Sequence, residues 1–347
     1  MKQNTSRLIV VVLCLVLVLP LLVSCGKQEA APEASNPPRQ SSPVTAYPVT
    51  VASYDANENP VPYTYKKTPE RVIIMHPGAT ELLLELGLED RILATIAPYG
   101  APAEHIADKY AKLNIMKAKY IPSQEYLLEM QPDLLIGWAH NFRASEVGDV
   151  ETWHQRNIGT YVVPTTLTRT APTLENAVYP FIADIGKIFN IQPQTDTYIE
   201  NCKKRVTLIE NKIRDIQKRK TVLILQDHYN GTFSIYGSKY LIDNIVQIAG
   251  GENLSKTPSS FLGPEKVLAF DPDVIIFVSS NKTGMGTDLT DAEANVHLKS
   301  IAELQSMRAI QEGSIINIPF NIVHSGSGRI IDAIEKVAKI LYPERFN

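Results

Sequence analysis

The chain has 347 residues, a net charge of -3 and three cysteines. A slightly acidic balance gives no reason to expect nucleic acid as a partner. Three cysteines exclude a disulfide framework, and a cluster-bearing redox protein would need more of them. The length suits one large or two modest domains with real hydrophobic cores.

The first residues have the pattern of a secretory signal that ends at a cysteine. Lys2 and Arg7 precede an apolar run over residues 8–23, which is shorter than the roughly 20 residues that a transmembrane helix needs. The quartet at 22–25 resembles a bacterial lipobox, which implies cleavage after Ser24 and lipidation of Cys25, palmitate being one expected acyl group. Residues 1–24 are therefore expected to be a signal peptide, and the protein to be anchored on the extracytoplasmic face of the cell membrane.

Residues 25–62 are expected to be a flexible tether. They are rich in Ala, Pro, Ser, Glu and Asn, and such weak hydrophobicity does not offset the entropy of ordering a chain.

A helix-to-strand unit occurs twice, as "EYLLEMQPDLLIGW" at 125–138 and "EKVLAFDPDVIIFV" at 265–278. In each copy a glutamate stands in the first turn of a short helix, which ends at Pro132 or Pro272. The apolar run that follows is continuous instead of alternating, as expected of a strand covered on both faces. Further strand and helix patterns surround each copy.

The alternation of strands and helices predicts an α/β fold with two Rossmann-like lobes and mainly parallel sheets. Between the lobes, apolar residues recur every three or four positions from Ile199 to Ile216, which predicts one helix about 35 Å long. Cys202 belongs to its apolar stripe and is expected to pack in the core. The expected domains are an N-terminal lobe at 63–192, the helix at 193–219 and a C-terminal lobe at 220–347.

From about Arg71 to Phe346 the chain resembles the substrate-binding lipoproteins of bacterial ABC importers for iron-siderophore, heme and vitamin B12 complexes. The likeness is carried by "RVIIMHPGATELLLELGLEDRIL", "PSQEYLLEMQPDLLIGW", "GPEKVLAFDPDVIIF" and "LYPERF". It implies a non-catalytic, monomeric protein that holds a metal chelate, foremost an iron-siderophore complex, between two lobes, with no intrinsic cofactor. Heme, a corrinoid or free metal is an alternative cargo.

The same resemblance gives the repeated glutamates a role. In the family one exposed glutamate on each lobe docks onto arginines of the permease, which works with its ATPase, and Glu125 and Glu265 match those positions. A plainer interpretation is that each acid only complements a helix dipole, which is worth about 0.3–1 kcal/mol.

The ligand cleft is predicted beyond the carboxyl ends of the strands, where open α/β sheets bind ligands. Aromatic residues there suit the faces of a chelate, and the two arginines suit carboxylates or phosphates. The candidate residues are His76, Tyr99, Trp138, His140, Arg143, His228, Tyr229, Phe320, Asn321, His324 and Arg329.

Four of these are also candidate metal ligands, namely His76, His140, His228 and His324, because neutral imidazole binds iron, nickel, copper and zinc. Ordinary hydrogen-bonding roles are the alternative for each. The stretch "HSGSGR" precedes a helix start, where free N–H groups attract anions, so an oxyanion such as molybdate or tungstate is a further possible cargo.

A surface-anchored hydrolase is an alternative function of a different class. The chain has no G-x-S-x-G nucleophile elbow after a strand and no H-E-x-x-H zinc helix, so the sequence favours a binding protein.

Overall fold

The computed structural model describes residues 45–117, 121–227, 229–280 and 288–346. The signal peptide, Cys25, most of the expected tether and His228 lie outside these ranges. Among the described helices, none is both long and apolar enough to cross a bilayer.

The N-terminal lobe is built on a parallel four-stranded sheet in the order β4-β3-β5-β6. These strands span Ile92–Thr95, Val72–Ile74, Leu134–Gly137 and Gly159–Val162. All residues of β3, β5 and β6 are buried, which is why their sequences are continuously apolar or small. Helices of this lobe are α1 (Pro77–Glu85), α2 (Ala107–Tyr110), α3 (Gln124–Glu129), α4 (Val150–His154) and α5 (Tyr179–Phe189).

The C-terminal lobe has a six-stranded sheet in which β7, β11 and β12 are parallel neighbours, β9 pairs with β7, and β8 and β10 are antiparallel. Its strands span Thr221–Asp227, Phe233–Ile235, Glu252–Asn253, Ser259–Leu262, Val274–Phe277 and Ile315–Asn317, from β7 to β12 in chain order. Its helices are α7 (Leu241–Ile248), α8 (Pro264–Leu268), α9 (Asp291–Lys299), α10 (Arg308–Glu312), α11 (Phe320–Val323) and α12 (Arg329–Leu341).

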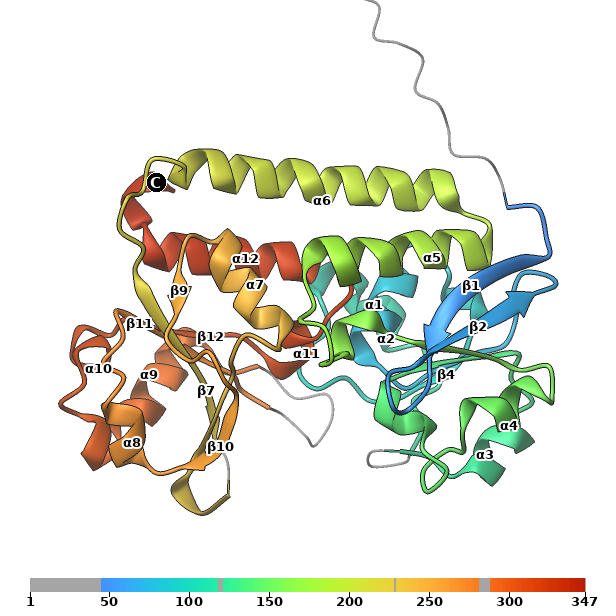
Figure 1. Cartoon of the computed structure of the whole chain (residues 1–347), viewed down its shortest axis with the longest axis horizontal. Helices are drawn as coiled ribbons and strands as arrows, with labels where there is room; N and C mark the ends of the chain where they lie inside the picture. The colour runs from blue at the N-terminus through green and yellow to red at the C-terminus, as the bar shows by residue number, and fades with distance from the viewer. Residues whose placement is uncertain (1–44, 118–120, 228, 281–287, 347) are drawn as a thin grey trace, which may run out of the picture. The chain divides into compact units, whose positions relative to one another are not determined.

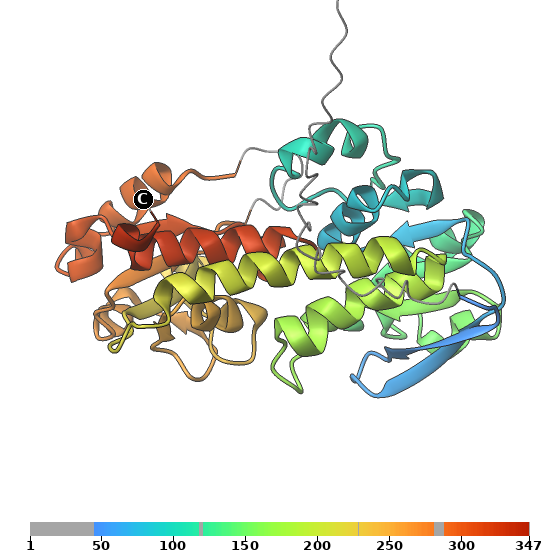
Figure 2. The same cartoon turned by 90° about the horizontal axis from the view of Figure 1, so that it is seen from above.

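The long helix is α6, Gln192–Ile213, and it packs against α5 of the first lobe and α12 of the second (Figures 1 and 2). At 1.5 Å per residue it extends about 33 Å. It starts one residue before the predicted helix at 193–219 and ends six residues before the predicted end. Cys202 is 6% exposed within the main hydrophobic cluster, and burial raises the pKa of its thiol to about 11, so it packs as an apolar residue.

The main hydrophobic cluster joins side chains of both lobes and of α6. Two glycines allow this close approach. A Cβ on Gly78 at the start of α1 would lie 2.9 Å from the Cα of Ser325, and one on Gly326 would overlap the ring of Phe181. The two-lobed α/β fold with one connecting helix is thus confirmed.

The C-terminal part of the expected tether is folded in the structure. Residues 49–65 form an antiparallel hairpin of β1 (Val49–Tyr54) and β2 (Pro60–Tyr65), with Val51 and Tyr65 buried against the first lobe. The side chain of Ser53 also accepts a hydrogen bond from the N–H of Val162 in β6. The hairpin therefore belongs to the folded lobe, and the expectation of a tether to residue 62 is wrong from residue 49 onward.

Candidate functional site

A pocket of about 270 Å³ is lined by residues that follow the carboxyl ends of strands in both sheets. Residues that follow β3, β4 and β5 meet residues that follow β11 and β12. The lining residues are Met75, Tyr99, Ile121, Trp138, His140, Asn141, Ser280 and Phe320. Four of the predicted cleft residues are among them, so the sheet-edge rule finds the pocket.

Aromatic rings from the two lobes meet in this pocket. Trp138 and Phe320 are stacked, with ring centroids 6.3 Å apart and an interplanar angle of 20°. Tyr99 meets Phe320 edge-on at 5.8 Å. The side chain of Asn141 accepts a hydrogen bond from the N–H of Trp138 at 2.8 Å, which holds the chain at this corner. The pocket therefore offers flat apolar faces to a ligand.

The described residues that line the pocket carry no fixed charge. None of the lining residues within the described ranges is Lys, Arg, Asp or Glu. Burial, with the nearby Arg143 guanidinium, lowers the pKa of His140. The described part of the lining is therefore uncharged at neutral pH.

Two further predicted histidines are buried beside the indole of Trp138. Ring centroids of His76 and His324 lie 4.6 Å and 5.2 Å from that of Trp138. Burial lowers the pKa of His76 to about 3 and that of His324 to about 4. Both imidazoles are therefore neutral at pH 7, because desolvation disfavours the charged form.

These histidines have different local surroundings. His76 is the N-cap of α1, and its Nδ1 accepts a hydrogen bond from the N–H of Ala79 at 3.1 Å, while its Nε2 is buried without a partner. His324 follows α11; Thr165 donates a hydrogen bond to its carbonyl oxygen, and its Nδ1 is buried without a partner.

Arg329 is not available to a ligand in the way the sequence predicted. It is 12% exposed, and its Nη1 donates to Glu81 at 2.8 Å and to the carbonyl of Ala101 at 3.0 Å. Asp288 lies 4.0 Å from its Nη2 and accepts from the N–H of Ala101. Arg329 therefore ties α12 of one lobe to α1 and to the segment after β4 of the other.

Two further candidates, Arg143 and Asn321, are not among the residues that line the pocket. Arg143 is exposed, although it follows the turn that bears His140. Asn321 is 4% exposed on α11, next to Phe320. His228 lies outside the described residues. Tyr229 lies in a short turn, Tyr229–Gly231.

Three N–H groups of the serine-glycine stretch are used within the protein. The N–H of Ser327 donates to the side chain of Ser325, that of Gly328 donates to Tyr198, and that of Arg329 donates to Ser327. Ser325 and Ser327 are also buried. These contacts do not favour an oxyanion site here, which stays a prediction from the sequence.

No group of three or more histidine, cysteine, aspartate or glutamate side chains is arranged to hold a metal ion within the described part of the chain. The roles of His76, His140 and His324 as metal ligands stay predictions.

The repeated glutamates are placed alike in the two lobes. Glu125 is in the first turn of α3 and Glu265 in the first turn of α8, and both side chains are exposed. Both helices lie on the side of residues 41–347 that is away from α6 (Figure 1).

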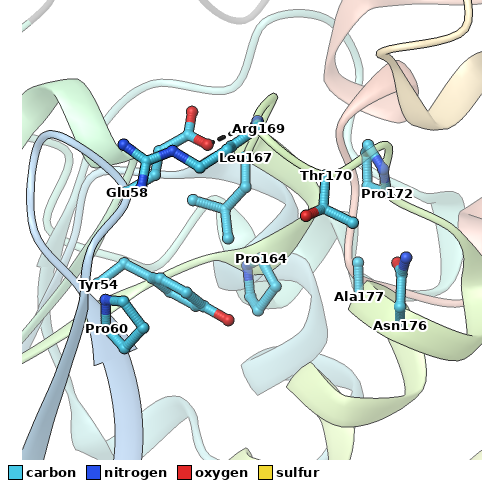
Figure 3. Close-up of a pocket in the computed structure, with 10 residues that line it drawn as sticks. All are labelled: Tyr54, Glu58, Pro60, Pro164, Leu167, Arg169, Thr170, Pro172, Asn176 and Ala177. Carbon is cyan, nitrogen blue, oxygen red and sulfur yellow. Dashed lines mark hydrogen bonds between the residues drawn. The ribbon is translucent and has the colours of Figure 1, made fainter.

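A second pocket, of about 330 Å³, lies between the hairpin and the segment that follows β6 (Figure 3). Glu58 accepts hydrogen bonds from the N–H groups of Thr168 and Arg169, so its charge is used within the lobe. Among the parallel strands that the structure describes, β6 alone leads into this pocket, through Pro164, whereas strands of both sheets lead into the first pocket. We therefore regard the pocket between the lobes as the candidate site.

Sequence reasoning missed Met75 and Ile121 in the pocket wall. In the sequence, Met75 has the pattern of the last residue of a buried strand. In the structure it directly follows β3 and lines the pocket. Ile121 lies outside any helix or strand, where no periodicity indicates its position.

Sequence and structure comparisons find known proteins that are similar to this chain. The chain is 23% identical over 337 residues, 96% of each chain, to the uncharacterized ABC transporter substrate-binding lipoprotein YvrC of Bacillus subtilis. It is 22% identical to a cobalamin-binding protein of Halobacterium salinarum, over 89% of this chain and 79% of that one. A periplasmic binding protein from Veillonella parvula has the same fold, with a TM-score of 0.73, 22% identity and coverage of 85% of this chain and 98% of that one.

The model of the family described as periplasmic binding protein matches residues 72–322, which include both sheets, α6 and every residue of the pocket between the lobes. The chain therefore belongs to the periplasmic binding protein family.

Proposed function

We propose that this protein is the substrate-binding component of an ABC importer and that its cargo is a metal chelate or metal-bearing macrocycle of low net charge. The observation that carries the proposal is the pocket lining, whose described residues include Tyr99, Trp138 and Phe320 and no Lys, Arg, Asp or Glu. A cargo with several carboxylates would leave them without a cation among the described lining residues, and burying an unpaired charge is costly.

The low charge narrows the cargo classes that the sequence left open. A corrinoid and a neutral ferric hydroxamate suit such a lining, whereas ferric citrate and molybdate do not. One relative, aligned over 89% of this chain, is named a cobalamin-binding protein, which favours the corrinoid. Because a corrinoid is larger than the pocket, it would enter by one edge.

Delivery and anchoring belong to the same proposal. Glu125 and Glu265 dock onto the permease, and a lipid on Cys25 keeps the protein at the extracytoplasmic face of the membrane. The exposed first-turn positions of both glutamates support the first of these.

Intrinsic fluorescence tests the cargo. Purified mature protein is titrated with cyanocobalamin, ferrichrome, hemin, ferric citrate and molybdate. We expect saturable quenching of Trp138 by cyanocobalamin or ferrichrome, because Trp138 lines the pocket. The Trp138→Phe variant retains only Trp153, which is fully buried in the first lobe, and so gives the background signal. A response confined to the three anionic probes, or no response to any probe, would contradict the proposal.

A further inference from the structure

Three buried side chains next to the pocket carry polar atoms that have no hydrogen-bond partner. They are Nε2 of His76, Nδ1 of His324, and both Oδ1 and Nδ2 of Asn321. The three residues are 1%, 7% and 4% exposed. More than nine in ten buried polar groups in proteins are hydrogen-bonded, so a group of unpaired atoms calls for a functional explanation.

These atoms belong to residues that border the pocket. The indole of Trp138, which lines it, is in ring contact with both His76 and His324. Asn321 directly follows Phe320, another lining residue, and shares α11 with it. His76 comes from the first lobe, whereas Asn321 and His324 come from the second, so the set joins both halves of the binding site.

The tautomer of His76 is fixed by its cap. Its Nδ1 accepts a hydrogen bond from the N–H of Ala79 at 3.1 Å. A neutral imidazole has one donor and one acceptor nitrogen, so the proton is on Nε2. His76 therefore presents an N–H donor, and it has no lone pair at Nε2 for a metal as long as the cap persists.

The unpaired atoms of Asn321 and His324 restrict which chemical group can bind beside the Nε2–H donor of His76. Asn321 supplies one acceptor and two donor hydrogens, and Nδ1 of His324 supplies one further site. Nε2 of His76 has no lone pair for a metal ion, and a carboxylate would meet no positive charge among the described lining residues while facing the Oδ1 of Asn321. A group that both accepts and donates hydrogen bonds without carrying charge satisfies the set.

We infer that His76, Asn321 and His324 form a subsite that recognises a primary carboxamide of the cargo, with the carboxamide oxygen accepting from His76 and its NH₂ group donating to Asn321 or His324. This inference rests on the proposed function and specifies how one site selects its cargo. It makes His76 a specificity residue instead of the metal ligand that the sequence suggested.

Cyanocobalamin is the probe, because it carries primary carboxamides around its ring, and its monocarboxylic acids, in which one carboxamide is hydrolysed, are the matched ligands. Affinities are measured for the wild type and for Asn321→Leu. We expect at least one acid to bind the wild type about tenfold or more weakly than the parent. We also expect Asn321→Leu to weaken the parent about tenfold and to lose most of that discrimination.

Asn321→Leu also has a stability readout. Replacing an unpaired buried amide by an apolar group of similar size is close to neutral or stabilising, so this variant is expected to keep or raise the melting temperature of the wild type. The His76→Asn variant retains a cap oxygen but shortens the side chain, and it is expected to weaken cyanocobalamin without loss of fold. Equal binding of parent and acids by the wild type, or unchanged discrimination in Asn321→Leu, would overturn the inference.

The tautomer is measured independently by ¹⁵N NMR of histidine-labelled, ligand-free wild-type protein. We expect an unprotonated Nδ1 and a protonated Nε2 for His76 at pH 7, and the reverse assignment would overturn the inference. Binding of ferrichrome without cyanocobalamin would also overturn it while leaving the proposed function intact. Binding of no probe would overturn both.

Discussion

The two buried histidines beside Trp138 link stability to pH. Each has a folded-state pKa, about 3 for His76 and about 4 for His324, below the value of about 6.5 in an unfolded chain. Below pH 6.5 the unfolded chain binds protons that the folded protein does not. Stability is therefore lost as the pH falls from 6.5 toward the folded-state values.

We predict that each histidine removes about 1.4 kcal/mol of unfolding free energy per pH unit below 6.5, or about 2 kcal/mol by pH 5. Urea unfolding at pH 7 and pH 5 measures this in the wild type and in the His76→Asn/His324→Gln variant. The variant should lose less stability over the same interval.

The pH dependence of stability that Glu81 contributes has the opposite sign to that of the two histidines. The wild type must therefore be compared with the histidine variant. Burial raises the pKa of Glu81 to about 7, although Arg329 opposes the shift, so the folded protein gains stability as the pH falls from about 7 toward the unfolded value of 4.5. This contribution is common to both proteins. Identical pH dependence of the wild type and the histidine variant would therefore show that His76 and His324 do not remain neutral in the fold.

The aspartates of the repeated Pro-Asp pair have a structural role that the sequence did not predict. The apolar runs predicted β5 and β11 correctly, whereas α3 and α8 end at Glu129 and Leu268, three and four residues before the prolines. The aspartates, however, act across the sheet: Asp133 accepts from the N–H groups of Glu70 and Arg71, and Asp273 accepts from the N–H and hydroxyl of Thr221. Each carboxylate thus binds the chain at or just before the start of the neighbouring strand, which only the strand order reveals.

Between elements, the Arg329–Glu81 pair joins α12 and α1 across the lobes. Removing one partner of a buried pair leaves the other charge uncompensated, whereas replacing both by apolar groups is often close to neutral.

We predict that Arg329→Met lowers the unfolding free energy by about 3 kcal/mol and that Arg329→Met/Glu81→Leu recovers most of this loss. Chemical denaturation of the wild type, both single variants and the double variant measures the coupling. Lys67→Met is the control, because Lys67 and Glu70 form an exposed pair at 3.7 Å whose loss should cost less than about 1 kcal/mol. Additive losses in the double variant would mean that the pair does not link the lobes energetically.

The elements differ in how well the sequence predicts them. Leu134–Gly137, Val274–Phe277 and α6 were found because a buried strand and an amphipathic helix have strong patterns. The β1–β2 hairpin was missed because its alternation, with only Val51, Ser53 and Tyr65 buried, is short and sits in a segment of weak average hydrophobicity. Arg329 was assigned to the ligand because the sequence cannot show that Glu81 lies across from it.

At the scale of the molecule, two lobes carry the same helix-to-strand unit and share one hydrophobic cluster through α6. The pocket lies at the carboxyl ends of the strands, while α3 and α8 stand on the side away from α6 (Figure 1). Neither of the acids proposed to meet the permease, Glu125 and Glu265, is among the residues that line the pocket.

We predict that reversing both acids, Glu125→Arg/Glu265→Arg, abolishes uptake of the bound cargo in cells while its affinity for the purified protein changes less than about twofold, because neither residue lines the pocket. Charge reversal places like charges opposite the arginines expected on the permease, which costs association more than neutralisation does. Glu129→Arg on α3 and Glu312→Arg on α10 are matched controls, since both are exposed acids on the last turn of their helices. They should leave uptake near the wild-type rate, which distinguishes docking at two positions from a general effect of surface charge. Uptake that survives the double reversal would restrict Glu125 and Glu265 to their effect on the helix dipole.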